Sequence, residues 1–261
     1  MTLSRTPFGT SIRISVAASY QLVSIRTAVF SLVLEPLLQV SLVALVVIAV
    51  GARSATMPAY AATLVGASAA VMSGMTAMMA SDRALSIVPE VFAFGLFRPV
   101  YWIGRAVVPA LLASVLALFA FAGIWLIEPR HSIHTLLAAL ICLPLAVIVG
   151  AVVGGASSVI SFAVNDPYII ANVVALAMPL LAGVVVPTED YPPFLQPVSF
   201  GIPMSGTVGF FRWLSMSRES VGPVAVHLAR EGVVLVAWLL IAYLVRRIAF
   251  RRVRKGETFS F

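Results

Sequence analysis

Six long runs of apolar residues limit what this chain can fold into more than any other feature. A helix of about 20 apolar residues is long enough to cross the ~30 Å hydrocarbon core of a bilayer. The runs cover residues 28–51, 58–80, 104–126, 133–162, 168–187 and 231–249. Hydrophobic residues make up 61% of the 261 residues and charged residues 10%, and the mean hydropathy is +1.06. We therefore expect an all-α integral membrane protein with six transmembrane helices in one domain, residues 1–261.

The distribution of Lys and Arg predicts the orientation of these helices, because cytoplasmic flanks carry an excess of basic residues. Twelve of the 17 basic residues fall on one side of alternating spans: Arg5, Arg13, Arg26, Arg83, Arg98, Arg105, Arg246, Arg247, Arg251, Arg252, Arg254 and Lys255. The other five are Arg53, Arg130, Arg212, Arg218 and Arg230. We expect a multi-pass protein of the cell (plasma) membrane with both termini cytoplasmic. The net charge of +7 is then an orientation signal, and no nucleic-acid partner is expected.

The segment before the first run is modestly amphipathic. Residues 8–25 place Ile12, Val16, Tyr20 and Val23 on one helical face and Arg13, Gln21 and Ser24 on the other. This pattern predicts an interfacial helix along the membrane surface, and the alternative is a longer, tilted first span. Within the first run, Glu35 is an intramembrane carboxylate that needs a partner or water. It either pairs with Arg26 or Arg13, or faces a dimer seam, a substrate path or a proton site.

Small residues recur at four-residue spacing in the second and fourth runs. They are Gly66, Ala70 and Gly74, and Gly150, Gly154 and Ser158. Small residues let helix backbones approach closely in lipid, so we expect close helix packing at these positions.

The connection between the second and third runs is unusually aromatic for a cytosolic loop. Between Asp82 and Arg105 it carries apolar side chains that include Phe92, Phe94 and Phe97. This composition predicts a short amphipathic helix whose apolar side meets a partner or the ends of other spans.

Five prolines interrupt the stretch that follows the fifth run. Residues 183–212 read GVVVPTEDYPPFLQPVSFGIPMSGTVGFFR, with Pro at 187, 192, 193, 197 and 203. Proline stops or kinks a helix, so one continuous helix is excluded. The stretch is also too apolar for a free loop. We expect an external re-entrant region over 188–229, with a pair of short helices that dip into the membrane edge between spans five and six.

The spacing in this stretch resembles the signature of the type 2 ATP-binding-cassette (ABC) exporter permeases. In that family a Gly-x-x-x-Pro ends the fifth span, a Pro-x-x-Leu-x-x segment follows, then an apolar-Pro-apolar step and an Arg. The matching positions are Gly183, Pro187, Pro193 to Gln196, Ile202-Pro203-Met204 and Arg212. The resemblance implies an interfacial helix before the first span and a coupling helix between spans two and three that docks on a separate ATPase subunit.

The resemblance also implies roles for individual residues. Arg98-Pro99-Val100 and Ile103-Gly104-Arg105 are similar to the family's entry into span three, and Leu85 to Glu90 lies where its Gly-Thr-Leu-Glu would fall. The coupling region is then 82–99, with the ATPase contact at Glu90, Phe92, Phe94, Phe97 and Arg98. The substrate path or lid would include Tyr191, Phe194, Phe200, Phe210, Arg212 and Glu35. We expect Arg212 to donate to carbonyls freed by the helix breaks; the alternative is that the region is a packed connector.

Several kinds of chemistry are excluded by the residues themselves. A Walker A motif needs Gly-Lys-Ser/Thr, and the one lysine, Lys255, follows Arg254 and precedes Gly256. No cofactor is therefore expected on this chain, and ATP and Mg²⁺ belong on a partner ATPase. His131, His134, His227 and Cys142 form no convincing metal or catalytic set, so we expect neither a metal site nor an enzyme.

The sequence thus predicts the transmembrane subunit of an ATP-driven ABC exporter. Its partners would be a P-loop ATPase, a second permease in a homo- or heterodimer, and membrane lipid. The nearly uncharged spans favour an amphipathic substrate such as a drug, a peptide or a lipid-like molecule. A lipid-linked glycan is the alternative substrate. An ATP-independent secondary transporter or channel would need several buried ionisable groups, and Glu35 is the one acid placed clearly within a run.

Overall fold

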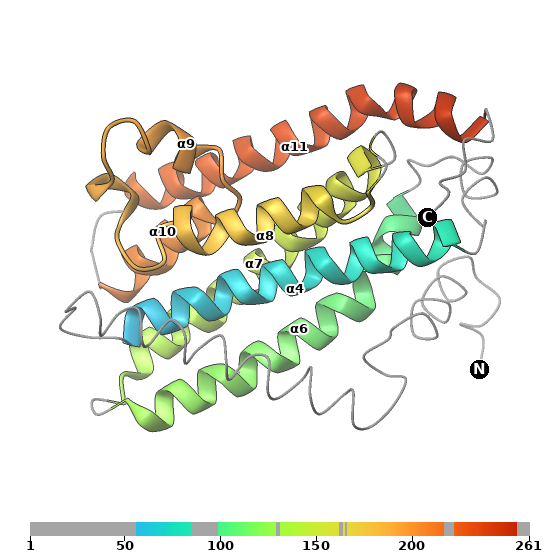
Figure 1. Ribbon diagram of the computed structural model, residues 1–261. Helices are drawn as coiled ribbons and strands as arrows, with labels where there is room; N and C mark the ends of the chain where they lie inside the picture. The colour runs from blue at the N-terminus through green and yellow to red at the C-terminus, as the bar shows by residue number, and fades with distance from the viewer. Residues whose placement is uncertain are drawn as a thin grey trace, which may run out of the picture.

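The computed structural model describes residues 56–84, 99–128, 131–161, 164, 166–216 and 222–254. Every regular element in these ranges is a helix (Figure 1). The elements are α4 (Thr56–Ala84), α6 (Pro99–Ile127), α7 (Ile133–Ser161), α8 (Ile169–Leu181), η4 (Thr188–Asp190), α9 (Gln196–Phe200), α10 (Ser205–Ser215) and α11 (Gly222–Arg254). The expectation of an all-α fold is confirmed for the described part of the chain.

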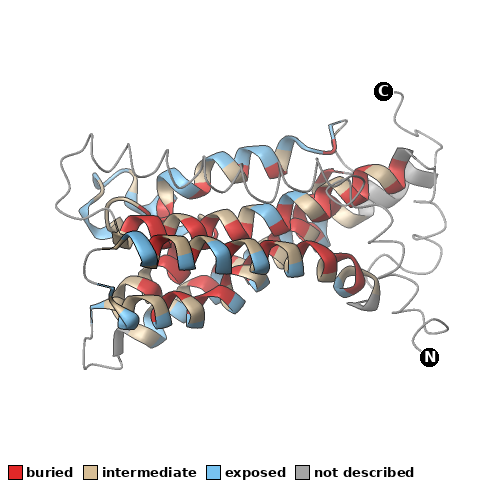
Figure 2. Cartoon of the chain, turned by 90° about the horizontal axis from the view of Figure 1, so that it is seen from below, coloured by how far each residue is buried: buried red, intermediate tan, exposed pale blue. Residues whose placement is uncertain are grey.

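The long helices run alternately up and down along one bundle (Figure 1). Four are long and apolar enough to cross a membrane: Thr56–Arg83, Tyr101–Ile127, Ile133–Ser161 and Val224–Arg246. Of an 18-residue apolar segment in each helix, 61% is buried in α4 and 17% in α11. The helix α4 is therefore central in the bundle and α11 is peripheral. Exposed residues lie along the outer faces of the helices (Figure 2). Many of them are large apolar residues, which a bilayer would solvate. The architecture fits a transmembrane protein.

Close contacts at glycines hold α4 against its neighbours, as the small-residue spacing predicts. The contact between α4 and α7 is the most extensive in the bundle. A Cβ atom at Gly150 of α7 would collide with the carbonyl oxygen of Ser68, and one at Gly154 would lie 2.9 Å from Met72 Cα. On α4, a Cβ at Gly74 would lie 2.9 Å from Pro109 Cβ of α6. Backbone therefore packs on backbone at Gly150 and Gly154, and the ring of Pro109 packs on Gly74.

Two expected helix boundaries are wrong. The fifth span was expected over 168–187, but α8 ends at Leu181 after 13 residues. Gly183 then has a φ of +82°, a left-handed conformation that stops a helix and favours glycine. The sixth helix was expected from residue 231 and begins at Gly222 instead. His227 and Arg230, which precede the expected span, thus lie within α11, as does Glu231 at the start of that span.

Other expectations fall on residues that the structure does not describe. The interfacial helix 8–25, the first span 28–51 with Glu35, and the stretch 85–98 lie outside the described residues. The stretch 85–98 holds the expected coupling residues Glu90, Phe92, Phe94, Phe97 and Arg98. These assignments stay predictions.

Candidate functional site

The chain between α8 and α11 is broken into short helices at its prolines. Pro187 precedes η4, Pro197 lies in the first turn of α9, and Pro203 stands two residues before α10. These elements gather at the end of the bundle where α4 begins (Figure 1). The expectation that no continuous helix crosses this stretch is confirmed.

Arg212 closes the break at the end of α8. Its Nε donates to the carbonyl of Gly183 at 3.0 Å, and its second guanidinium nitrogen donates to the carbonyl of Val184 at 2.8 Å. These are carbonyls just past the helix C-terminus, where a cation is favoured. Burial lowers the pKa of Arg212, and the nearby Glu189 acts in the opposite direction. The predicted hydrogen bonds of Arg212 are therefore present.

Glu231 closes the break before α10, a role that was not predicted from the sequence. The two carboxylate oxygens of Glu231 accept the backbone N–H groups of Met204, at 2.9 Å, and of Thr207, at 2.8 Å. The side chain is almost completely buried. A signal was available, since Glu231 begins an apolar run next to Arg230.

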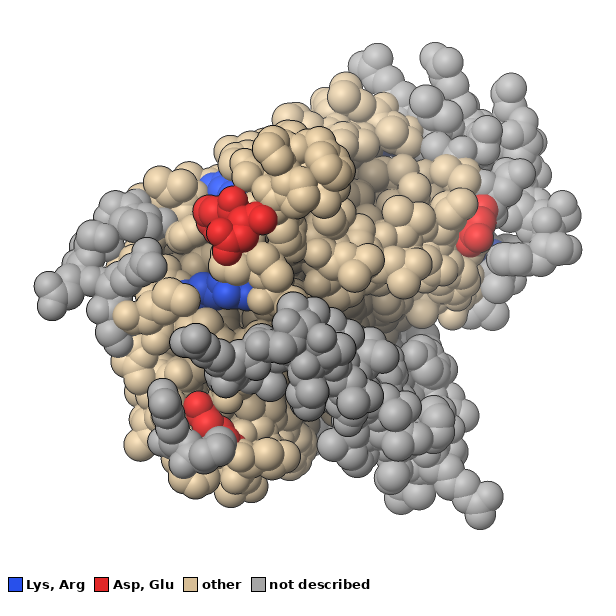
Figure 3. Space-filling view, turned by 60° about the vertical axis from the view of Figure 1, so that its left-hand side comes forward, with Lys and Arg blue, Asp and Glu red and all other residues tan. Residues whose placement is uncertain are grey.

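Further side chains tie η4 and α9 to the rest of the region. The hydroxyl of Tyr191 donates to the carbonyl of Leu180 at 2.9 Å, and burial raises its pKa. Gln196 Nε2 donates to the carbonyls of Glu189, at 3.1 Å, and Tyr191, at 3.0 Å. Arg230 donates to Thr188 Oγ1 at 3.3 Å. Glu189 and Asp190 are exposed, and Figure 3 shows acidic atoms gathered beside basic ones on this face.

The aromatic residues expected at the substrate path are not all in one place. Phe194 is 72% exposed, and Phe200 is 50% exposed beneath the guanidinium of Arg230, 4.6 Å from its ring centre. Phe210 packs against the main core and stacks on Trp213. Phe194 and Phe200 therefore point away from the buried core of the bundle. Their assignment to a lid or path stays a prediction.

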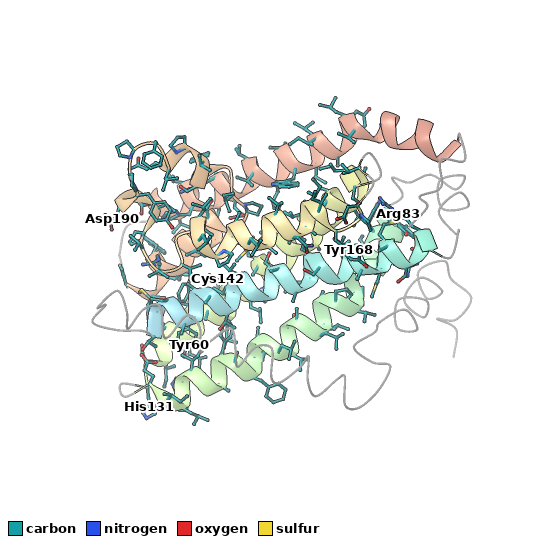
Figure 4. The ribbon with its side chains drawn as sticks, viewed as in Figure 1. Tyr60, Arg83, His131, Cys142, Tyr168 and Asp190 are labelled. Carbon is teal, nitrogen blue, oxygen red and sulfur yellow. The ribbon has the colours of Figure 1, made fainter. Side chains whose placement is uncertain are left out.

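A second polar cluster lies at the opposite end of the bundle, where α4 ends and α6 begins. Asp82 and Arg105 form a 2.6 Å ion pair, and the Tyr101 hydroxyl donates to Asp82 at 2.8 Å. Arg83 donates to Ser161 Oγ of α7 at 2.9 Å. Figure 4 shows Arg83 near Tyr168 at this end, far from Asp190 at the other. Asp82 was expected in a cytosolic connection and instead lies within α4, whereas Arg105 lies in α6, within the expected third span. Both side chains are buried, and each compensates the charge of the other.

The remaining candidate ligands have local roles. His131 contacts the carbonyl of Trp125 at 2.9 Å, and Cys142 is buried in α7. Among the residues that the structure describes, no three His, Cys, Asp or Glu side chains are placed to hold a metal ion.

Comparison with known proteins gives no family. No protein-family model matches the chain, and no curated protein matches it either. The resemblance of residues 183–212 to exporter permeases therefore rests on the residues themselves and on where they lie.

Proposed function

We propose that the chain is the transmembrane subunit of an ATP-driven exporter of the type 2 ABC class. The contact of Arg212 with the carbonyls of Gly183 and Val184 carries this proposal. Gly183 begins the resembled signature and Arg212 ends it, 29 residues later. Their direct contact gives the spacing a physical reason, because the arginine satisfies the carbonyls that the glycine break leaves free. The run 28–51 would be the first of six spans, and an even number of spans would leave both termini cytoplasmic.

The mechanism we propose is mechanical. Two permease subunits pair, and each docks on an ATPase through its segment 85–98. This segment connects the two helices that the Asp82–Arg105 ion pair joins. A push on the segment is then delivered to α4 and α6 together rather than to one helix alone. Because α4 packs most extensively on α7, the displacement reaches the centre of the bundle.

The substrate class follows from the spans. Their apolar composition suits an amphipathic molecule, either drug-like, peptide or lipid-like, more than a free ion. A lipid-linked glycan is the second substrate class. An ATP-independent transporter would couple through titratable groups. The buried carboxyl groups of the described residues are already committed, since Asp82 binds Arg105 and Glu231 caps α10.

Co-purification with a P-loop ATPase encoded in a neighbouring reading frame tests the proposal. Replacing both Phe94 and Phe97 with Ala should weaken the complex. Loss of a central interface aromatic costs about 2 kcal/mol or more. That energy corresponds to about a 30-fold rise in Kd. Phe119→Ala is the matched control, because Phe119 is 74% exposed on α6, in the middle of a predicted span.

Two results would contradict the proposal. One is transport of amphipathic compounds by the purified chain in liposomes with no ATPase present. The other is that no P-loop ATPase binds the chain under any condition in which the chain is monodisperse. An unchanged complex with the Phe94 and Phe97 variant would move the contact to another segment.

A further inference from the structure

Glu231 caps a helix to which it does not belong. It lies in α11, yet its carboxylate accepts N–H groups at the start of α10, 27 and 24 residues earlier in the chain. The first N–H groups of a helix have no acceptor within that helix, and a negative charge is favoured beside them. Both carboxyl oxygens accept a hydrogen bond, so this polar group is not left unsatisfied although it is almost completely buried within an apolar span.

The start of α10 has no local substitute for this cap. Its N-cap residue is Met204, whose side chain has no oxygen, and no side-chain cap is formed there. Met204 also has a φ of +74°, which is uncommon for a residue with a Cβ atom. The surrounding contacts must hold this conformation, and the bond from Met204 N–H to Glu231 is one of them.

Close packing reinforces the same contact. A Cβ atom at Gly206 would collide with the carbonyl oxygen of His227, and one at Gly209 would lie 2.8 Å from His227 Cε1. Two glycines three residues apart thus let α10 rest directly on the first turns of α11. The opposite end of α10 is tied elsewhere, since Arg212 binds the carbonyls of Gly183 and Val184 beyond α8.

We propose that Glu231 is a positioning residue: with Arg212, it joins the outer ends of α8, α10 and α11 into one rigid unit that moves as a whole. The contacts of Glu231 and Arg212, one at each end of α10, connect this helix to α11 and to the end of α8. The part of the inference that concerns transport rests on the function proposed above. The rigidity of the unit does not depend on that function.

Distances between spin labels test the rigidity in the full chain. In a Cys142→Ala background, one label pair is placed at Met216, at the C-terminal end of α10, and at Leu239 of α11. Both residues are exposed. A reference pair at Leu228 and Leu244 lies within α11 alone. The protein is held in nanodiscs of phosphatidylethanolamine and phosphatidylglycerol. We expect a single narrow distance distribution for each pair.

Three variants separate positioning from general folding. Glu231→Gln keeps the size but offers one acceptor oxygen, so it should lose the narrow component of the Met216–Leu239 pair while the reference pair is unchanged. Glu231→Asp keeps two acceptors and the charge, so it should restore part of that component. Arg230→Gln removes a neighbouring charge whose side chain binds Thr188 and not α10. It should leave the distance distributions of both label pairs as in the wild type.

A narrow Met216–Leu239 distribution in Glu231→Gln, equal to that of the wild type, would overturn the inference. So would a loss of the narrow component in Arg230→Gln to the same extent. With the ATPase bound, Glu231→Gln should transport less substrate per ATP hydrolysed at an unchanged ATPase rate. An unchanged ratio would overturn the claim that the unit moves as a whole. Absence of any ATPase partner would defeat the proposed function and leave the distance result standing.

Discussion

Asp82 and Arg105 come from different helices, and their side chains are 2% and 6% exposed. Removing one partner of a buried ion pair leaves the other as an uncompensated charge, which is worse than having neither. The tyrosine hydroxyl of Tyr101 cannot replace the carboxylate, because it is neutral and already donates to Asp82. At the scale of single residues, this pair is the place where a small change should have the largest effect on stability.

We predict that Asp82→Asn lowers the free energy of unfolding by about 3–5 kcal/mol. The double variant Asp82→Leu with Arg105→Met removes both charges and should lose much less. Titration of the purified protein with SDS, followed by tryptophan fluorescence, measures both. A single variant as stable as the wild type, or a double variant less stable than the single one, would contradict this account.

The two residues that close the helix breaks differ in how far the sequence reveals them. Arg212 was predicted to bind free carbonyls because it ends a spaced series of Gly and Pro, and its two bonds confirm this. Glu231 was missed. Its partners lie 27 and 24 residues away and are backbone N–H groups, which carry no side-chain signature. A cap supplied by another helix follows from tertiary packing, which local spacing does not encode.

Among the elements, the α4–α7 contact depends on the absence of side chains at two positions. Gly in a helix interior is normally less stable than Ala by about 1 kcal/mol, so a helical Gly→Ala change tends to stabilise. Gly150 should show the opposite sign, because a Cβ atom there meets the backbone carbonyl of Ser68. Gly123 has no atom within 4 Å of the same added Cβ.

We therefore predict that Gly150→Ala lowers the free energy of unfolding by about 1–3 kcal/mol, the usual cost of overpacking. Gly123→Ala should be neutral or slightly stabilising. Reversible unfolding in mixed micelles compares the two variants directly. Equal changes in the free energy of unfolding for the two variants would show that helix propensity, rather than contact with α4, determines the effect of Gly150→Ala.

The apolar runs predicted that the long helices form, but they predicted less well where each helix begins and ends. The apolar runs 104–126 and 133–162 correspond closely to α6 and α7. The run 168–187 does not correspond to one helix, because Gly183 adopts a conformation that hydropathy does not report. The run 231–249 starts nine residues after α11 does. The turns of α11 that precede this run include His227 and pack against α10, a contact that hydropathy does not report.

For the whole molecule, the alternation of the helices and the distribution of basic residues lead to one prediction of topology. In a Cys142→Ala background, a cysteine placed at Ala55 or Ser132 should react with a reagent that cannot cross the membrane. A cysteine at Ser260 should not react in intact cells and should react after permeabilisation. The physical reason is the excess of basic residues near the C-terminus and in the connection after α4. Labelling of Ser260 alone in intact cells would invert the topology.

The early end of α8 has a consequence for the surrounding lipid. Thirteen helical residues extend about 20 Å, which falls short of the ~30 Å hydrocarbon thickness of a typical bilayer. The helix does not continue through residues 183–186, and the cationic side chain of Arg212 lies against Gly183 and Val184. Ala182, Gly183 and Val184 are buried, so protein rather than lipid surrounds this break, and Arg212 satisfies its carbonyls. A bilayer beside α8 would therefore meet a helix about 10 Å shorter than its hydrocarbon core, a mismatch that local thinning of the lipid annulus would relieve.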